Sequence, residues 1–126
     1  MSKENVETMR ELYEAFNSGD IPVVLSRMDE NITWNEADGD YYIGPQAVLN
    51  GLFNSLSNNW QGFRVTPEEF LDAGEHIVTL GIYMGTNIAT GASLRLPFAH
   101  VWGLKDGKLV RFQEYSVTRP PKDGAE

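Results

Sequence analysis

The sequence contains no cysteine, which excludes disulfide bonds, thiolate nucleophiles and cysteine-ligated zinc or iron–sulfur centres. Its two histidines, His76 and His100, show no local metal-ligand spacing. No run approaches the ~20 apolar residues that span a bilayer, and the first residues are charged where a signal peptide is apolar. We therefore expect a cytoplasmic protein with no metal site and no other cofactor.

Positive charge is scarce as well. Ten Lys and Arg stand against 18 Asp and Glu, which gives a net charge of -8, and no basic cluster occurs along the chain. Binding to nucleic acids or to anionic membranes depends on basic side chains that neutralise phosphates. We therefore expect neither partner, and the composition favours a small hydrophobic ligand or another protein.

The length of 126 residues, with 41% hydrophobic residues, fits one domain with a single core. No repeat, low-complexity segment or linker divides the chain. We expect one domain over residues 1–119, followed by a C-terminal tail over residues 120–126.

Three helices are predicted in the first half of the chain. Apolar residues recur at helical spacing through residues 4–17, and a second apolar stripe begins directly after Asp20, which is a suitable N-cap. A third helix should begin at Gly44-Pro45 and end near Asn59. Residues 37–42 are polar and are predicted to form a loop.

The second half changes to a period of two. Four runs, residues 63–73, 76–89, 92–104 and 108–118, are separated by short turns and predict an antiparallel meander. Residues 31–36 predict an earlier strand that pairs at an edge of this sheet.

These elements predict an α+β fold in which three N-terminal helices pack on a strongly curved, mostly antiparallel sheet. The open end of such a sheet leaves a ligand pocket. Apolar side chains are expected on the outer face of the sheet, and they predict a homodimer through that face. The candidates are Ile77, Leu94, Leu96 and Val101.

Four stretches carry a resemblance to a known family: "LYEAFNSGD", "WNEADGDYYIGPQAVLNGL", "PEEFLDAGEHIVTLGIYMGT" and "FAHVWGLKDGKLVRFQEYSVT". They resemble the SnoaL-like branch of the NTF2-like superfamily over nearly the whole chain. The resemblance implies a cone-shaped α+β barrel. It implies less about the reaction, because the superfamily includes ketosteroid isomerase, polyketide cyclases and proteins without enzymatic activity.

The resemblance also suggests catalytic positions. The general base of ketosteroid isomerase corresponds to Glu36, whereas its oxyanion hole has no evident counterpart in this sequence. The acid/base Asp that many SnoaL-like proteins carry on the last strand is replaced by Val117, so Glu114 or His100 would have to substitute for it.

Two interpretations of Glu36 follow from the residues themselves. In a strand, Ile32, Trp34 and Glu36 share one face, so a partly buried carboxyl with a raised pKa could exchange protons with a carbon acid. Alternatively, the strand ends at Asn35 and Glu36 turns outward into water.

His100 lies between Phe98 and Trp102 on one strand face. It is either a core histidine or the partner of Glu36, as an acid or as an orienting group. Aromatic residues at the predicted pocket either line it or simply fill the core. The candidates are Tyr13, Trp34, Phe53, Tyr83, Trp102 and Tyr115, of which Tyr115 is expected to face inward in place of its neighbour Glu114, by the resemblance.

The sequence therefore supports two kinds of function. The first is a cofactor-independent isomerase- or cyclase-type enzyme that moves a proton on a small hydrophobic molecule, with Glu36 as base and His100 as partner. The alternative is a non-catalytic module that binds a ligand in the same pocket or interacts with proteins through its dimer surface.

Overall fold

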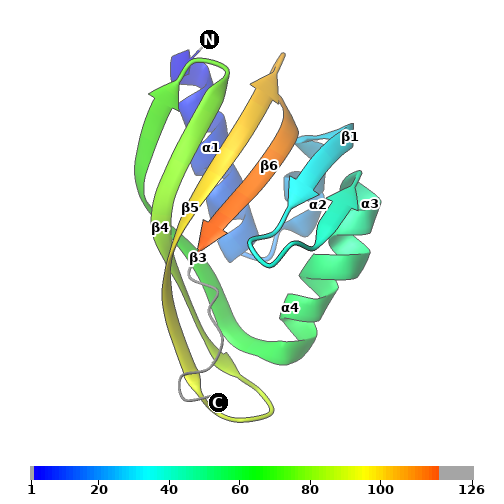
Figure 1. The fold of residues 1–126 in the computed structure, drawn as a ribbon, viewed down its shortest axis with the longest axis vertical. Helices are drawn as coiled ribbons and strands as arrows, with labels where there is room; N and C mark the ends of the chain where they lie inside the picture. The colour runs from blue at the N-terminus through cyan, green and yellow to red at the C-terminus, as the bar shows by residue number, and fades with distance from the viewer. Residues whose placement is uncertain (1, 117–126) are drawn as a thin grey trace.

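The computed structural model describes residues 2–116, which form three helical segments and one six-stranded sheet (Figure 1). Residues 45–59 are a single helical segment with a π-helical turn, η1, in its middle. In chain order the elements are α1 (Ser2–Asn17), α2 (Ile21–Ser26), β1 (Met28–Asn35), β2 (Tyr41–Ile43), α3 (Pro45–Val48), η1 (Leu49–Phe53), α4 (Asn54–Asn59), β3 (Trp60–Ala73), β4 (His76–Asn87), β5 (Ser93–Lys105) and β6 (Lys108–Ser116). The predicted C-terminal tail and the predicted strand end at residue 118 lie outside the described residues.

The strands have the order β2-β1-β6-β5-β4-β3. All neighbours are antiparallel except β1 and β6, which run parallel. The predicted meander of four long strands is present, and β1 pairs at its β6 edge as predicted, while β2 adds a further strand on the outer side of β1. The sheet is curved and not closed, so the expected cone-shaped barrel is an open one with β2 and β3 as its edges.

The chain order of strand 31–36 before the third helix was predicted, but because of it the three helical segments are not all N-terminal to the sheet. α1 and α2 precede the sheet, whereas the third segment follows β1 and β2. In Figure 1, α1 packs along β3 and β4, and α3 packs against β1 and β2. The first two residues of β2, Tyr41 and Tyr42, were predicted as part of a loop, and a strand of three residues beside a polar stretch carries too little alternation to be recognised.

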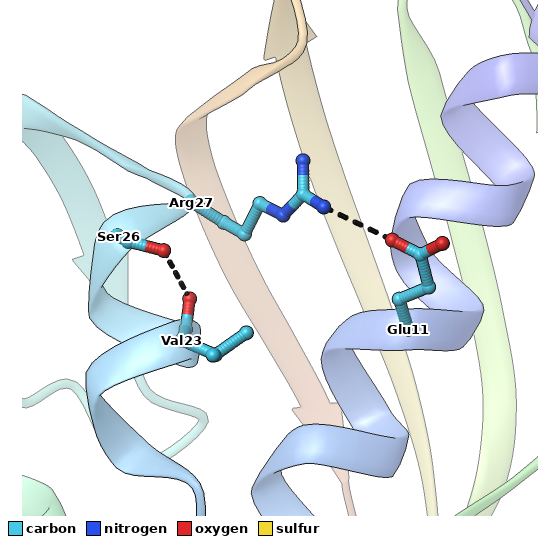
Figure 2. Close-up of polar contacts among 4 residues, drawn as sticks. All are labelled: Glu11, Val23, Ser26 and Arg27. Carbon is cyan, nitrogen blue, oxygen red and sulfur yellow. Dashed lines mark hydrogen bonds and ion pairs between the residues drawn. The ribbon is translucent and has the colours of Figure 1, made fainter.

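The junction between α1 and α2 follows the chemistry of helix ends. Gly19 has a φ of 83°, a left-handed conformation that favours glycine, and the Asp20 side chain accepts a hydrogen bond from Val23 N at the start of α2. Figure 2 shows an ion pair at 3.0 Å between Arg27, directly after α2, and Glu11 of α1. Both side chains are more than a third exposed, so this pair contributes little to stability.

Strand alternation decides which side chains face the helices. Ile77 lies opposite Trp102 across β4 and β5, and both are buried in the core. The expectation that Ile77 belongs to an outer dimer face is therefore wrong. Leu94 and Leu96 also face inward, toward the cavity described below. Val101 is the one residue of that predicted set that shares the outer face, opposite Val78.

Two close contacts fix the position of elements around the open end of the sheet. Gly51 in η1 lies against the ring of Tyr42, so closely that a Cβ at this position would overlap a ring carbon. At the C-terminus of α1, Asn17 bonds both backbone groups of Val65 on β3, donating to Val65 O at 2.8 Å and accepting from Val65 N at 2.9 Å. No helix in the described part of the chain is long and apolar enough to cross a membrane.

Candidate functional site

The cavity between the helices and the concave side of the sheet has a volume of about 410 Å³. Its wall is mainly apolar, and it includes five of the six aromatic residues predicted to line a pocket. These are Tyr13, Trp34, Phe53, Tyr83 and Trp102. Three carboxyl side chains also reach the wall: Glu36, Asp38 and Glu114. Within residues 2–116, no Lys or Arg lines the cavity.

The expectation that Tyr115 faces inward in place of Glu114 is wrong. Its side chain is 57% exposed, while Phe112 and Glu114 on the same strand are buried and line the cavity. Alternate residues of a strand face opposite sides, so Tyr115 faces outward as a consequence of Phe112 facing the core. The alternation from Phe112 was the signal in the sequence that placed Glu114 inside.

Glu36 faces the cavity although β1 ends one residue earlier, at Asn35. The indole of Trp34 donates a hydrogen bond to Glu36 Oε2 at 2.6 Å and holds the carboxyl inward. Burial and the negative charge of Glu114 raise the pKa of Glu36 to about 8, while the bond from Trp34 lowers it. Glu36 is therefore protonated at pH 7.

The register of the parallel strands explains why the two carboxyls meet. Asn35 of β1 pairs with Gln113 of β6, so the residues that follow, Glu36 and Glu114, come side by side. Glu114 accepts hydrogen bonds from Ala37 N, at 3.0 Å to Oε1, and from the Tyr83 hydroxyl to Oε2. The two carboxyls therefore have different partners: Glu36 accepts a bond from one indole, whereas Glu114 accepts bonds from a backbone amide and a hydroxyl.

His100 is held between two tyrosines. The Tyr13 hydroxyl lies 2.7 Å from Nδ1 and the Tyr83 hydroxyl lies 2.6 Å from Nε2, and Trp102 Nε1 donates to the Tyr13 oxygen at 2.8 Å. Burial lowers the pKa of His100 to about 3, so the ring is neutral at pH 7. Burial raises the pKa of both tyrosines, so they remain neutral hydroxyls.

The hydrogen-bond partners favour one tautomer of His100. Because Tyr83 gives its proton to Glu114, its oxygen accepts from His100 Nε2–H. Nδ1 then accepts the proton of Tyr13. As a neutral ring with both nitrogens engaged, His100 cannot deliver a proton as an imidazolium; of the two predicted partner roles, the orienting one fits this geometry.

The sequence indicated the Glu36 and His100 positions but not their connection. Tyr13 and His100 are 87 residues apart, and Tyr13 and Trp102 are 89 apart, so no local pattern joins them. Within the described part of the chain, no group of three His, Asp or Glu side chains is arranged to hold a metal ion.

A family model described as a SnoaL-like domain matches residues 9–112. The chain belongs to the SnoaL-like family, and its fold is that of the NTF2-like proteins. An NTF2-like protein of unknown function from Burkholderia pseudomallei K96243 is 32% identical, with a TM-score of 0.82 and 90% of each chain covered.

Two further structures are similar. TerC, crystallised with polyporic acid, is 25% identical with a TM-score of 0.80, covering 90% of this chain and 91% of TerC. A protein from Jannaschia sp. CCS1 named as a SnoaL-like polyketide cyclase has a TM-score of 0.82, with 92% of this chain and 87% of that chain covered. It is 17% identical, so it supports the fold alone. No curated protein has a significant match in sequence.

Proposed function

We propose that this protein is a cofactor-independent enzyme that moves a proton on a small hydrophobic molecule, in the manner of an isomerase or a cyclase. The observation that carries the proposal is the pair of carboxyls, Glu36 and Glu114, on the wall of an otherwise apolar cavity. Such a pair offers an acid and a base at the same pH, because one carboxyl keeps a proton that the other has lost.

The hydrogen bonds suggest how the roles divide. Glu114 is the base, since its carboxylate is held by Tyr83 and Ala37 and lies in a site of low polarity. Glu36, protonated at pH 7, is the acid that donates a hydrogen bond to a substrate carbonyl as negative charge develops on the oxygen. The sequence suggested Glu36 as the base and offered no donor for the oxyanion. In the proposed division of roles, Glu36 is that donor and Glu114 is the base.

The charges of the cavity favour a neutral substrate. Besides the neutral Glu36, the acidic residues Asp38 and Glu114 reach the wall without a nearby Lys or Arg among residues 2–116, so an anionic ground state would be repelled. The apolar remainder suits a ring-containing carbonyl compound. TerC was crystallised with polyporic acid, which supports a small organic molecule as the ligand class for this fold.

Proton transfer can be tested without knowledge of the product. Hydrophobic ketones and lactones that raise the melting temperature of the protein are incubated with it in deuterium oxide, and exchange next to the carbonyl is followed by NMR. A ligand at 100 times its Kd stabilises the fold by about 2.7 kcal/mol, which selects the compounds. We expect catalysed exchange in the wild type.

The matched controls are Glu30→Gln, an exposed glutamate of β1, and Tyr115→Phe, the exposed neighbour of Glu114. Both should exchange at the wild-type rate. If compounds bind to the wild type but show no catalysed deuterium exchange, the result would contradict the proposed enzymatic function. It would favour a ligand-binding module.

We also infer a homodimer through the outer face of the sheet. The helices cover the concave face, and the outer face presents half-buried apolar side chains, including Val78, Leu80 and Val101. Sedimentation equilibrium should give twice the chain mass for the wild type and a shift toward the monomer for Val101→Lys. A monomeric wild type would contradict this inference.

A further inference from the structure

The hydroxyl oxygen of Thr79 accepts no hydrogen bond from the described residues, although its side chain is 0% exposed. Thr79 lies on β4 directly opposite His100 on β5. It also lies beside Tyr13: burial raises the pKa of Tyr13, and the Thr79 hydroxyl, placed as a donor toward the Tyr13 oxygen, lowers it. A buried hydroxyl oxygen that accepts no hydrogen bond leaves an acceptor unused, and its position next to a chain of hydrogen bonds needs an explanation.

Every proton of that chain points away from Thr79. Trp102 donates to Tyr13, and Tyr13 donates to His100 Nδ1. On the other side of the ring, His100 Nε2–H donates to Tyr83, which donates to Glu114. The carboxylate of Glu114 sets this direction, because an ionised carboxylate can only accept hydrogen bonds.

A neutral Glu114 removes that constraint, since a carboxylic acid can donate. If Glu114 donates to Tyr83, then Tyr83 donates to His100 Nε2, and the proton of the ring must sit on Nδ1 and point to Tyr13. The Tyr13 oxygen can accept from both His100 and Trp102, but its own proton then needs a new acceptor, and Thr79 Oγ1 is the vacant one.

We propose that the hydrogen-bond chain has two orientations, and that Thr79 is the positioning residue that completes the second one, in which Glu114 is neutral and His100 carries its proton on Nδ1. The second orientation holds one proton more than the first, taken up by Glu114 from solvent. His100 loses a proton at Nε2 and gains one at Nδ1, so the charge of the ring does not change.

In the second orientation Glu114 is in a resting form. A proton on Glu114 that is directed at Tyr83 is no longer directed at the cavity. Its bearing on turnover rests on the proposed role of Glu114 as base, whereas the two orientations do not depend on any reaction. The titratable groups that face this region come from α1, the end of β1 and the loop after it, β4 and β6: Tyr13, Glu36, Asp38, Tyr83 and Glu114.

Glu114→Gln tests the proposal at neutral pH, because a glutamine imitates the neutral acid. Its amide oxygen can keep the bond from Ala37 N, and its amide nitrogen then donates to Tyr83. The tautomer of His100 is read from the ¹⁵N NMR signals of the ring. The signals of His76, the other histidine, are assigned with His76→Gln.

We expect Nε2–H in the wild type and Nδ1–H in Glu114→Gln. Thr79→Val removes the acceptor at nearly constant shape, so the double variant Glu114→Gln/Thr79→Val should fail to adopt the Nδ1–H form, while Glu114→Gln/Thr79→Ser should retain it. In the wild-type background, Thr79→Val should leave the tautomer unchanged, since Thr79 accepts no hydrogen bond there. In the Glu114→Gln background the same change should lower the Tm.

Three results would overturn the proposal: Nδ1–H in the wild type at neutral pH, Nε2–H in Glu114→Gln, or Nδ1–H in the double variant with valine. If Glu114→Gln does not fold, the wild type is titrated toward acid instead. The Nδ1–H form should then appear in it and in Thr79→Ser but not in Thr79→Val, and any other pattern overturns the proposal. These measurements need no substrate, so an absence of deuterium exchange would refute the proposed function alone.

Discussion

The protonated state of Glu36 makes the stability of this protein depend on pH in a direction that is unusual for a carboxyl. The substitution Glu36→Gln tests this dependence. The glutamine cannot ionise, while its amide oxygen can still accept the hydrogen bond from the Trp34 indole. The pKa of Glu36 is raised from 4.5 to about 8, so the folded protein keeps a proton that the unfolded chain releases. The contribution is fully present below about pH 4.5 and is lost as the pH rises through about 8.

The size of the effect follows from the pKa change. A rise from 4.5 to about 8 corresponds to at most about 5 kcal/mol. Glu36 is partly exposed and shares its environment with Glu114, so we expect about 2 to 5 kcal/mol. Relative to Glu36→Gln, the wild type should lose that amount of unfolding free energy between pH 4.5 and pH 9.

Urea unfolding of both proteins at a series of pH values measures the difference directly, because the titration of all other groups cancels to first order. Glu30→Gln, an exposed glutamate of the same strand, serves as the control and should differ from the wild type by a constant amount. If the difference between wild type and Glu36→Gln stays constant within about 0.5 kcal/mol, Glu36 is an ordinary ionised carboxyl, and the acid assigned to the site does not exist.

Further outcomes follow from the same geometry. Glu114→Gln should slow deuterium exchange by about 10² to 10⁴, the usual contribution of a general base, and a rate within a few-fold of wild type would exclude that role. Catalysed exchange should fall as the pH rises through about 8, where Glu36 loses its proton. Trp34→Phe removes a bond that lowers the pKa of Glu36, so the fall should move to higher pH; an unchanged profile would mean that the indole does not hold the acid. Gly51→Ala should destabilise the fold by about 1 to 3 kcal/mol in urea unfolding, because its methyl group would meet the Tyr42 ring, and a neutral effect would show that the ring moves freely.

The parts of the fold that were predictable are those with local, periodic signals. The helical stripe of α1 and the alternation along β3 to β6 were visible in the sequence, and the structure agrees within a few residues. The parallel pairing of β1 with β6 joins residues 78 to 81 positions apart in the sequence, and no local pattern specifies such a pair. The short strand Tyr41–Ile43 is fixed by its pairing with β1, a tertiary contact that overrides its polar surroundings.

For the site, too, the sequence indicated individual residues but not the contacts between them. Glu36 could be proposed from the strand face it shares with Trp34, but the strand ends before it, and a side-chain hydrogen bond keeps it inside. Glu114 was considered as a substitute, yet Tyr115 was preferred as the inward residue on the resemblance alone, whereas alternation from the buried Phe112 places Glu114 inside. The chain of hydrogen bonds through His100 depends on rotamers that sequence patterns do not encode.

The pair of hydrogen bonds between Asn17 and Val65 has a consequence for how copies of this protein meet. β3 is an edge strand, and the backbone N–H and C=O of such a strand form a template on which a foreign strand can add. At Val65 both groups are already occupied by a side chain that imitates a peptide unit. At Val65, the backbone of β3, the longest strand of the sheet, is therefore hydrogen-bonded to α1. A strand from another molecule cannot pair there, so growth into a continuous sheet of many molecules is blocked at that point.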